Sequence, residues 1–217
     1  MLPLAAIIYG LLGAGALLWC WLAGRLPWPL YDPVVSNTTL LLQGLGAGLT
    51  LGLAVVLLSR VMVAHLRWVR ALHQWFYQAL GPLTGAQVLA LAVLSSVGEE
   101  LFFRGAMQPA WGIVPTTLLF TLLHFPSRLV LCSWTAMAGL LGLAFGYLTA
   151  WTGSIAGATL AHLLINALNL SHITRFGNCV PRAPAGRRNS DRPAVENLPR
   201  PDLAPSSVRE NSERRSF

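Results

Sequence analysis

Six long apolar segments dominate the first 170 residues, and they restrict the fold more than any other feature. They span residues 4–24, 38–59, 85–105, 111–125, 129–151 and 154–170. About 20 apolar residues cross the roughly 30 Å hydrocarbon core of a bilayer, where helices satisfy their own backbone polar groups. Charged residues make up only 11% of the chain, against about 25% in a soluble domain. The sequence therefore predicts an all-α, polytopic membrane helix bundle with about six transmembrane helices, of which the fourth is the shortest.

Residues 60–80 separate the second and third apolar segments and have an amphipathic pattern. Polar side chains fall on one helical face, beside Trp68 and Trp75. These side chains are Arg60, Arg67, Arg70, Gln74 and Gln78. The pattern is typical of a helix that lies in the membrane interface. The alternative interpretation is a polar extension of the second spanning helix.

The positions of the basic residues predict the topology. All 15 are arginines. The odd-numbered segments are followed only by Arg25 and the motif residue Arg104, whereas the even-numbered segments are followed by Arg60, Arg67 and Arg70, then Arg128, then Arg175. Because loops rich in arginine stay in the cytoplasm, both termini are expected there. The net charge of +7 is explained in this way, without a nucleic-acid partner.

Composition divides the chain into three expected regions. Residues 1–84 form a two-helix membrane region with the interfacial helix, and residues 85–172 form a core that carries the polar motifs. Residues 173–217 form a tail rich in proline, arginine and serine. Such a composition cannot bury enough apolar surface to fold, so this tail is expected to be disordered.

Two adjacent acids stand in the middle of the third apolar segment. Glu99 and Glu100 are the only acidic residues between Asp32 and Asp191. An ionisable group at bilayer depth costs at least about 2.5 kcal/mol, so such residues usually have a function. Glu100 and Arg104 are four residues apart and share a helical face. Glu99 is expected to face another part of the bundle, where it has no neighbouring cation. A carboxylate in such a position suits the role of a general base. The alternative is a buried ion pair that only orders the bundle.

Two histidines and an asparagine also lie in apolar segments. His124 follows Phe120 by one helical turn, and His162 precedes Asn166 by one turn. Glu and His side chains can polarise a water, and His and Asn can donate hydrogen bonds to a developing oxyanion. Two His and a Glu could instead bind zinc, but the His-Glu-x-x-His spacing is absent. We expect no cofactor, with zinc as the alternative.

The three motifs, in this order, resemble a known family. Residues 99–105 match EExxxR followed by glycine, residues 120–124 match FxxxH and residues 162–166 match HxxxN. Together they are similar to the CPBP family of intramembrane proteases, which includes the type II CAAX prenyl endopeptidases. The resemblance covers roughly residues 85–170.

The resemblance implies roles for six residues. It makes Glu99 the catalytic base, His124 a residue that helps to activate the water, and His162 and Asn166 the oxyanion hole. Glu100 and Arg104 have supporting roles. It also implies a glutamate-type mechanism that needs no metal.

The sequence thus predicts an intramembrane endopeptidase that hydrolyses a peptide bond in a membrane-associated protein or peptide. Its short loops favour a bacterial cytoplasmic (inner) membrane. One alternative is a non-catalytic membrane binding protein, such as a bacteriocin self-immunity factor. Another is a proton-coupled transporter, since intramembrane Glu and His also build proton relays. A transporter is expected to show inverted repeats, and the sequence shows none.

Overall fold

The computed structural model describes residues 2–25, 38–125, 128 and 131–179, and its regular secondary structure within them is helical. In chain order the helices are α1 (Leu2–Leu22), α2 (Thr38–His65), α3 (Arg67–Leu80), α4 (Gly85–Glu99), the π-helix η1 (Glu100–Met107), α5 (Gln108–Trp111), α6 (Ile113–Leu123), α7 (Cys132–Thr152) and α8 (Ala156–Cys179). The predicted all-α class is confirmed.

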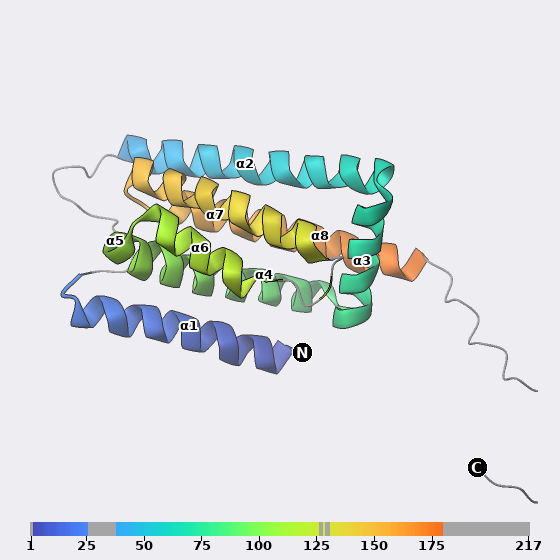
Figure 1. Cartoon of the computed structure of the whole chain (residues 1–217), viewed down its shortest axis with the longest axis horizontal. Helices are drawn as coiled ribbons and strands as arrows, with labels where there is room; N and C mark the ends of the chain where they lie inside the picture. The colour runs from blue at the N-terminus through green and yellow to red at the C-terminus, as the bar shows by residue number, and fades with distance from the viewer. Residues whose placement is uncertain (1, 26–37, 126–127, 129–130, 180–217) are drawn as a thin grey trace, which may run out of the picture. The chain divides into compact units, whose positions relative to one another are not determined.

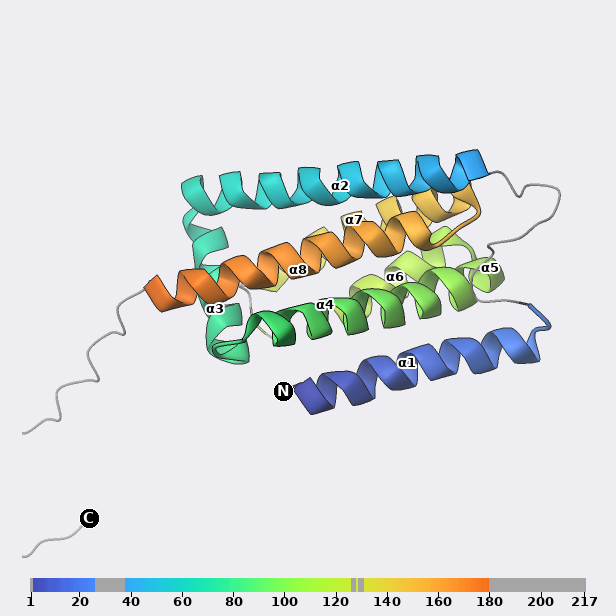
Figure 2. The ribbon, with the colours of Figure 1, turned by 180° about the vertical axis from the view of Figure 1, so that it is seen from behind.

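The long helices of the described part run roughly along one another. Figures 1 and 2, taken from opposite sides, show α8 between α2 and α4, with α1 on the far side of α4. In both views α3 crosses the end of this bundle. The bundle thus places the motif-bearing helices α4 and α8 side by side at its centre.

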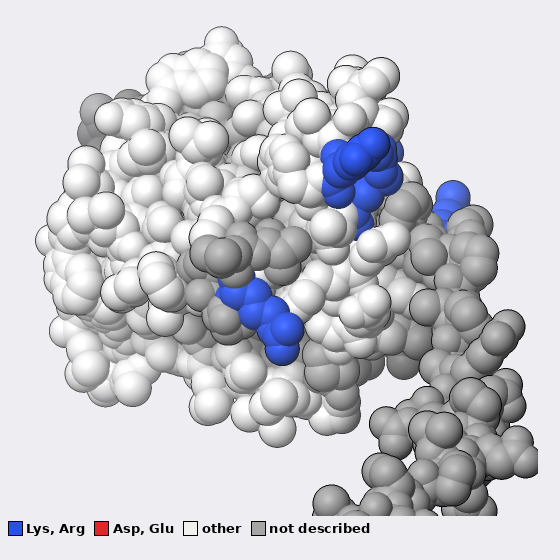
Figure 3. All heavy atoms as spheres, turned by 45° about the vertical axis from the view of Figure 1, so that its right-hand side comes forward, with Lys and Arg blue, Asp and Glu red and all other residues white. Residues whose placement is uncertain are grey.

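Four helical stretches of the described part are long and apolar enough to cross a membrane. They are Leu2–Leu22, Thr38–His65, Gly85–Trp111 and Cys132–Thr152. The predicted fourth span is shorter than expected, because α6 covers only Ile113–Leu123. At 1.5 Å per residue, such a helix does not cross the hydrocarbon core alone. Figure 3 shows a surface on which the described residues are mostly uncharged, with a few arginines and no acid in view. The chain is an integral membrane protein.

The structure changes the expected limits of two elements. Arg60 lies inside α2, which continues to His65, and extended backbone at Leu66 (φ −107°, ψ 120°) separates α2 from α3. The expected interfacial helix therefore starts at Arg67 and does not include Arg60. At the other end, α8 continues to Cys179, so the expected tail at 173 begins inside a helix. Residues 180–217 lie outside the described part, and the three expected regions remain a prediction.

Glycines bring α2 and α8 into backbone contact. Gly44, Gly48 and Gly52 recur every four residues on α2 and are buried. A Cβ placed on Gly48 would lie 2.1 Å from the carbonyl oxygen of Gly157, and one on Gly52 would lie 3.2 Å from Ala161. Small residues at this spacing let membrane helices approach closely. The contact holds α8, with its His162 and Asn166, against α2.

The acid pair lies where an α-helix becomes a π-helix. Helix α4 begins with a capping box between Thr84 and Gln87, and its α-helical part ends at Glu99. From Glu100 the chain follows η1 for eight residues. Such a long π-helix is rare, and π-helical turns are frequently found at functional sites. The change of helix type therefore occurs inside the Glu-Glu motif.

Candidate active site

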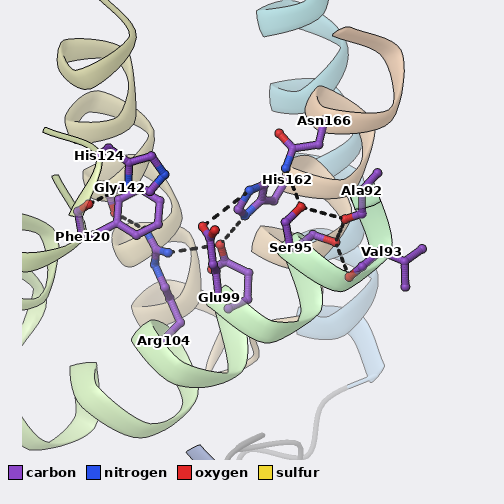
Figure 4. Close-up of polar contacts among 12 residues, drawn as sticks. Ala92, Val93, Ser95, Glu99, Arg104, Phe120, His124, Gly142, His162 and Asn166 are labelled. Atoms are coloured by element: carbon purple, nitrogen blue, oxygen red, sulfur yellow. Dashed lines mark hydrogen bonds and ion pairs between the residues drawn. The ribbon is translucent and has the colours of Figure 1, made fainter. Parts of the chain in front are cut away.

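The helices surround a cavity of about 370 Å³, and four of the predicted site residues line it. Glu99 ends α4, His124 follows α6 as its C-cap, and His162 and Asn166 stand one turn apart on α8. Figure 4 shows these side chains reaching one region from separate helices. The structure thus brings together residues that are up to 67 positions apart in the sequence (99 to 166).

A buried chain of polar contacts runs from Arg104 through Glu100 to His162. Arg104 Nη1 lies 3.1 Å from Glu100 Oε1, as the four-residue spacing predicted. Arg104 Nη2 donates to the carbonyl oxygen of Gly142 at 3.1 Å, and its guanidinium lies 4.6 Å from the centre of the Phe120 ring. Arg104 and Glu100 are 1% and 0% exposed. The cation therefore offsets the charge of a carboxylate that has no access to water.

Glu100 determines which nitrogen of His162 faces the cavity. His162 Nδ1 lies 2.8 Å from Glu100 Oε1. Because a carboxylate only accepts hydrogen bonds, Nδ1 carries the proton and donates it. The His162 ring also stacks on Phe145, with the ring centres 5.6 Å apart. Only Nε2 is left for chemistry in the cavity.

Glu99 faces that second nitrogen. Its Oε2 lies 3.9 Å from His162 Nε2, too far for a direct hydrogen bond. This oxygen is buried and has no hydrogen-bond partner among the described residues. The sequence predicted that Glu99 and Glu100 face different parts of the bundle. This prediction is wrong, because both carboxylates face the same histidine. Both approach His162, one at each ring nitrogen.

His124 is held at the edge of the cavity by its own helix and by aromatic rings. Its Nδ1 lies 2.7 Å from the carbonyl oxygen of Phe120. A carbonyl oxygen accepts, so Nδ1 donates and Nε2 is the nitrogen left for other contacts. The His124 ring centre lies 4.4 Å from Phe120 and 4.9 Å from Trp134. These contacts explain the four-residue spacing of the FxxxH motif, since residue 120 supplies both the acceptor and the ring.

Asn166 binds a residue that lies outside the three sequence motifs. Asn166 Nδ2 donates to Ser95 Oγ at 2.8 Å. Ser95 lies on α4, one turn before Glu99, and lines the same cavity. The sequence held one signal for this contact. Ser95 lies four residues before Glu99, and residues at that spacing share a helix face, so Ser95 faces the same cavity as Glu99.

Tyr9 is a second site residue that the sequence analysis missed. It lines the cavity from α1, and its hydroxyl is within hydrogen-bonding reach of the Glu99 carboxyl. Gly98 permits this approach, because a Cβ there would lie 2.9 Å from the Tyr9 carbonyl oxygen. Nothing in the sequence around Tyr9 indicates the contact, since it depends on how α1 packs against α4.

The cavity extends from Glu99 to α3. Its far end is lined mainly by apolar side chains, which include Trp68, Leu72 and Phe76 of α3. His73 is buried there, with its ring centre 5.5 Å from that of His172. Burial, and then repulsion from His172 and Arg60, lowers the pKa of His73 from 6.5 to about 4. The cavity thus joins a polar centre to an apolar volume.

The side chains around the cavity do not form an evident metal site. Across the described ranges, no group of three His, Cys, Asp or Glu residues is placed to hold a metal ion. His162 Nδ1 and His124 Nδ1 are already engaged, by Glu100 and by the Phe120 carbonyl oxygen. That the chemistry needs no cofactor stays a prediction.

The fold and cavity define a polytopic helical membrane protein with a buried centre of carboxylates, histidines and an amide. Residues 81–168 match the family described as type II CAAX prenyl endopeptidase Rce1-like. This segment, which contains all six predicted site residues, is therefore similar to a family of proteases. This confirms the resemblance drawn from the three motifs.

A curated relative matches part of the same chain. It is the uncharacterized protein YpbD of Bacillus subtilis (strain 168), which is 33% identical over 84 residues. The match covers 37% of this chain and 42% of YpbD, so it spans less than half of either protein. No solved structure matches the chain significantly.

Proposed function

We propose that this protein is an intramembrane endopeptidase that hydrolyses a peptide bond in a membrane-associated protein or peptide. The observation that carries the proposal is the placement of Glu99. Its Oε2 is buried, has no hydrogen-bond partner among the described residues and lies 3.9 Å from His162 Nε2, at the wall of a cavity. The similarity of residues 81–168 to a family of proteases supports the same conclusion.

Glu99 is the general base in this proposal, with His124 assisting. A water bound beside Glu99 Oε2 gives a proton to the carboxylate while its oxygen bonds to the scissile carbonyl carbon. When the C–N bond breaks, that proton passes to the departing amine. His124 contributes Nε2, since its Nδ1 is held by the Phe120 carbonyl oxygen. Positioned proton transfer of this kind contributes about 10²–10⁴-fold to rate.

His162 and Asn166 stabilise the oxyanion. Asn166 offers the amide N–H that it does not donate to Ser95, and His162 offers Nε2. Because Nδ1–H of His162 is donated to Glu100, the ring donates to an oxyanion only when Nε2 is protonated as well. Each such donor contributes about 3 kcal/mol to catalysis in known oxyanion holes.

Glu100 and Arg104 keep His162 in position. Glu100 fixes the ring through Nδ1, and Arg104 balances the charge of Glu100. Replacing either one leaves a buried charge without its partner, which typically costs about 3–5 kcal/mol in stability. Their proposed role is therefore to orient the ring, and they do not touch the substrate.

The lining of the cavity supports a proposal about the kind of substrate. Its end at α3 is largely apolar, so it suits a peptide that carries an apolar side chain or attached lipid. We propose that the substrate enters from the bilayer or its surface. We also propose that the protein lies in a bacterial cytoplasmic membrane with both termini in the cytoplasm, as the arginine distribution predicts.

The test is peptide cleavage by the full chain in detergent micelles. The first probe is an internally quenched peptide with a farnesylated CAAX end, the substrate type in the family's description. The second is the same peptide without the lipid. Glu99→Gln keeps the side-chain shape and removes the base, so kcat should fall at least about 100-fold. Tyr147→Phe, at a tyrosine that is 61% exposed, is the control and should match the wild type.

Three results would count against the proposal. Equal cleavage by the wild type and Glu99→Gln removes Glu99 from the mechanism. Binding of a probe without cleavage, with equal affinity in the wild type and in Asn166→Ala, indicates a binding protein. Failure of the wild type to cleave either probe contradicts peptidase activity on this substrate class.

A further inference from the structure

We propose that Ser95 is a positioning residue that sets the direction in which Asn166 donates its hydrogen bond. The inference rests on the proposed function, because it assigns Ser95 to the oxyanion hole of that reaction. Ser95 is buried, with 6% exposure, and lines the cavity one turn before Glu99. It is a site residue outside the three motifs.

The hydrogen-bond directions follow from the number of protons that Ser95 has. Its hydroxyl donates to the carbonyl oxygen of Ala92 at 3.3 Å. A serine hydroxyl has one proton and two lone pairs, so Ser95 can only accept from Asn166. The Nδ2 group of Asn166 therefore faces Ser95, at 2.8 Å. This contact fixes which end of the Asn166 amide points toward α4.

Fixing one N–H of Asn166 also fixes the other. The amide NH₂ group is planar, with its two hydrogens about 120° apart. With one hydrogen donated to Ser95, the second has a defined direction, and Asn166 itself lies at the cavity wall. An oxyanion that forms near Glu99 would meet a donor that is already aligned. Such preorganised donors avoid a reorganisation cost during the reaction.

Ser95 also belongs to a pair of contacts that joins the continuous stretch of α4 and η1 to α8. Glu100 meets His162 at 2.8 Å, and Ser95 meets Asn166 at 2.8 Å. From the first contact to the second, the chain goes backward from Glu100 to Ser95 and forward from His162 to Asn166, each by about one turn, as expected for antiparallel helices. Figure 4 shows Ser95 directed toward Asn166. The Ser95 contact thus holds α8 in the register that places His162 beside the acid pair.

The neighbouring serine provides a matched control. Ser96 is fully buried, and among the described residues its hydroxyl contacts only its own helix, at 2.7 Å from the carbonyl oxygen of Ala92 and 3.3 Å from that of Val93. Ser96→Ala removes a hydroxyl of the same kind, from the next residue of the same helix. It leaves every predicted site residue with its contacts, so its activity should equal that of the wild type.

The experiment measures kcat and KM of the full chain in micelles with the farnesylated probe. Ser95→Ala should lower kcat about tenfold and leave KM unchanged, because an oxyanion donor acts in the transition state. Ser95→Thr retains a hydroxyl that can bond to the same backbone carbonyl, so it should restore kcat to within about twofold. In an Asn166→Ala background, Ser95→Ala should have no further effect, since the two residues act as one unit.

The outcomes separate this inference from the proposed function. If the wild type is active and Ser95→Ala retains its kcat, the inference is wrong while the proposed function stands. The inference is also wrong, and the proposed function still stands, if Ser95→Ala lowers kcat by the same factor in the wild-type and in the Asn166→Ala background. If Ser95→Thr is as impaired as Ser95→Ala, the hydroxyl is not the cause, and the inference also fails. A wild type that cleaves neither probe overturns both.

Discussion

Replacing Gly48 by alanine should force α2 away from α8. The new Cβ would lie 2.1 Å from the carbonyl oxygen of Gly157, 2.8 Å from its carbonyl carbon and 2.9 Å from its Cα. Carbon atoms in contact lie about 3.5–4.0 Å apart. All three neighbours are backbone atoms, which cannot rotate away, so the two helices must separate by about 1 Å.

The size of the effect follows from what that separation disrupts. The apolar cluster between α2, α7 and α8 contains Val56, Phe145, Ala161 and Ile165. A gap of about 0.5–1 Å loses a quarter to a half of each dispersion contact, and overpacking typically costs about 1–3 kcal/mol, occasionally more. We expect Gly48→Ala to lower the free energy of unfolding by about 3 kcal/mol.

A second glycine of the same helix is the control. Gly46 is exposed, and a Cβ there would meet nothing within 4 Å. Gly46→Ala should therefore leave the free energy of unfolding unchanged or raise it by up to about 1 kcal/mol, through helix propensity. Unfolding by added SDS in mixed micelles, followed by circular dichroism, measures both variants. A Gly48→Ala variant as stable as the wild type, or a Gly46→Ala variant equally destabilised, would refute the reasoning.

Two further predictions concern residues outside the motifs. Tyr9→Phe should lower kcat about tenfold, because it removes a hydroxyl within reach of the Glu99 carboxyl. Peptide cleavage measures this, and an effect equal to that of Tyr147→Phe would contradict it. The pKa of about 4 for His73 lies below its ordinary value of 6.5, so between these values the unfolded chain binds more protons than the folded one. Stability should therefore fall by up to about 3 kcal/mol as the pH decreases from 6.5 to 4. His73→Phe should reduce this pH dependence, as measured by SDS unfolding. The control His65→Gln, at an exposed position, should retain it. If the free energy of unfolding changes equally with pH in both variants, His73 is not the source.

Local rules predicted part of the site before its geometry was known. The Glu100–Arg104 pair forms because residues four apart share a face of one helix, and η1 preserves that proximity. Local sequence did not show that Glu100 would also bind His162. That contact needs α8 to lie beside α4 in one particular register. The same register brings Ser95 to Asn166, so both contacts depend on packing between helices.

The sequence alone determined that this chain is an all-helical membrane protein and which of its polar residues to single out. The reason is energetic: lipid tolerates few polar groups, so long apolar segments and the rare charges within them are visible without a structure. Tertiary structure decided which atoms meet. It joined Tyr9 to Glu99, turned one nitrogen of His162 toward each carboxylate and brought α2 against α8 at Gly48. These contacts depend on the rotation and depth of each helix relative to its neighbours, which no single segment encodes.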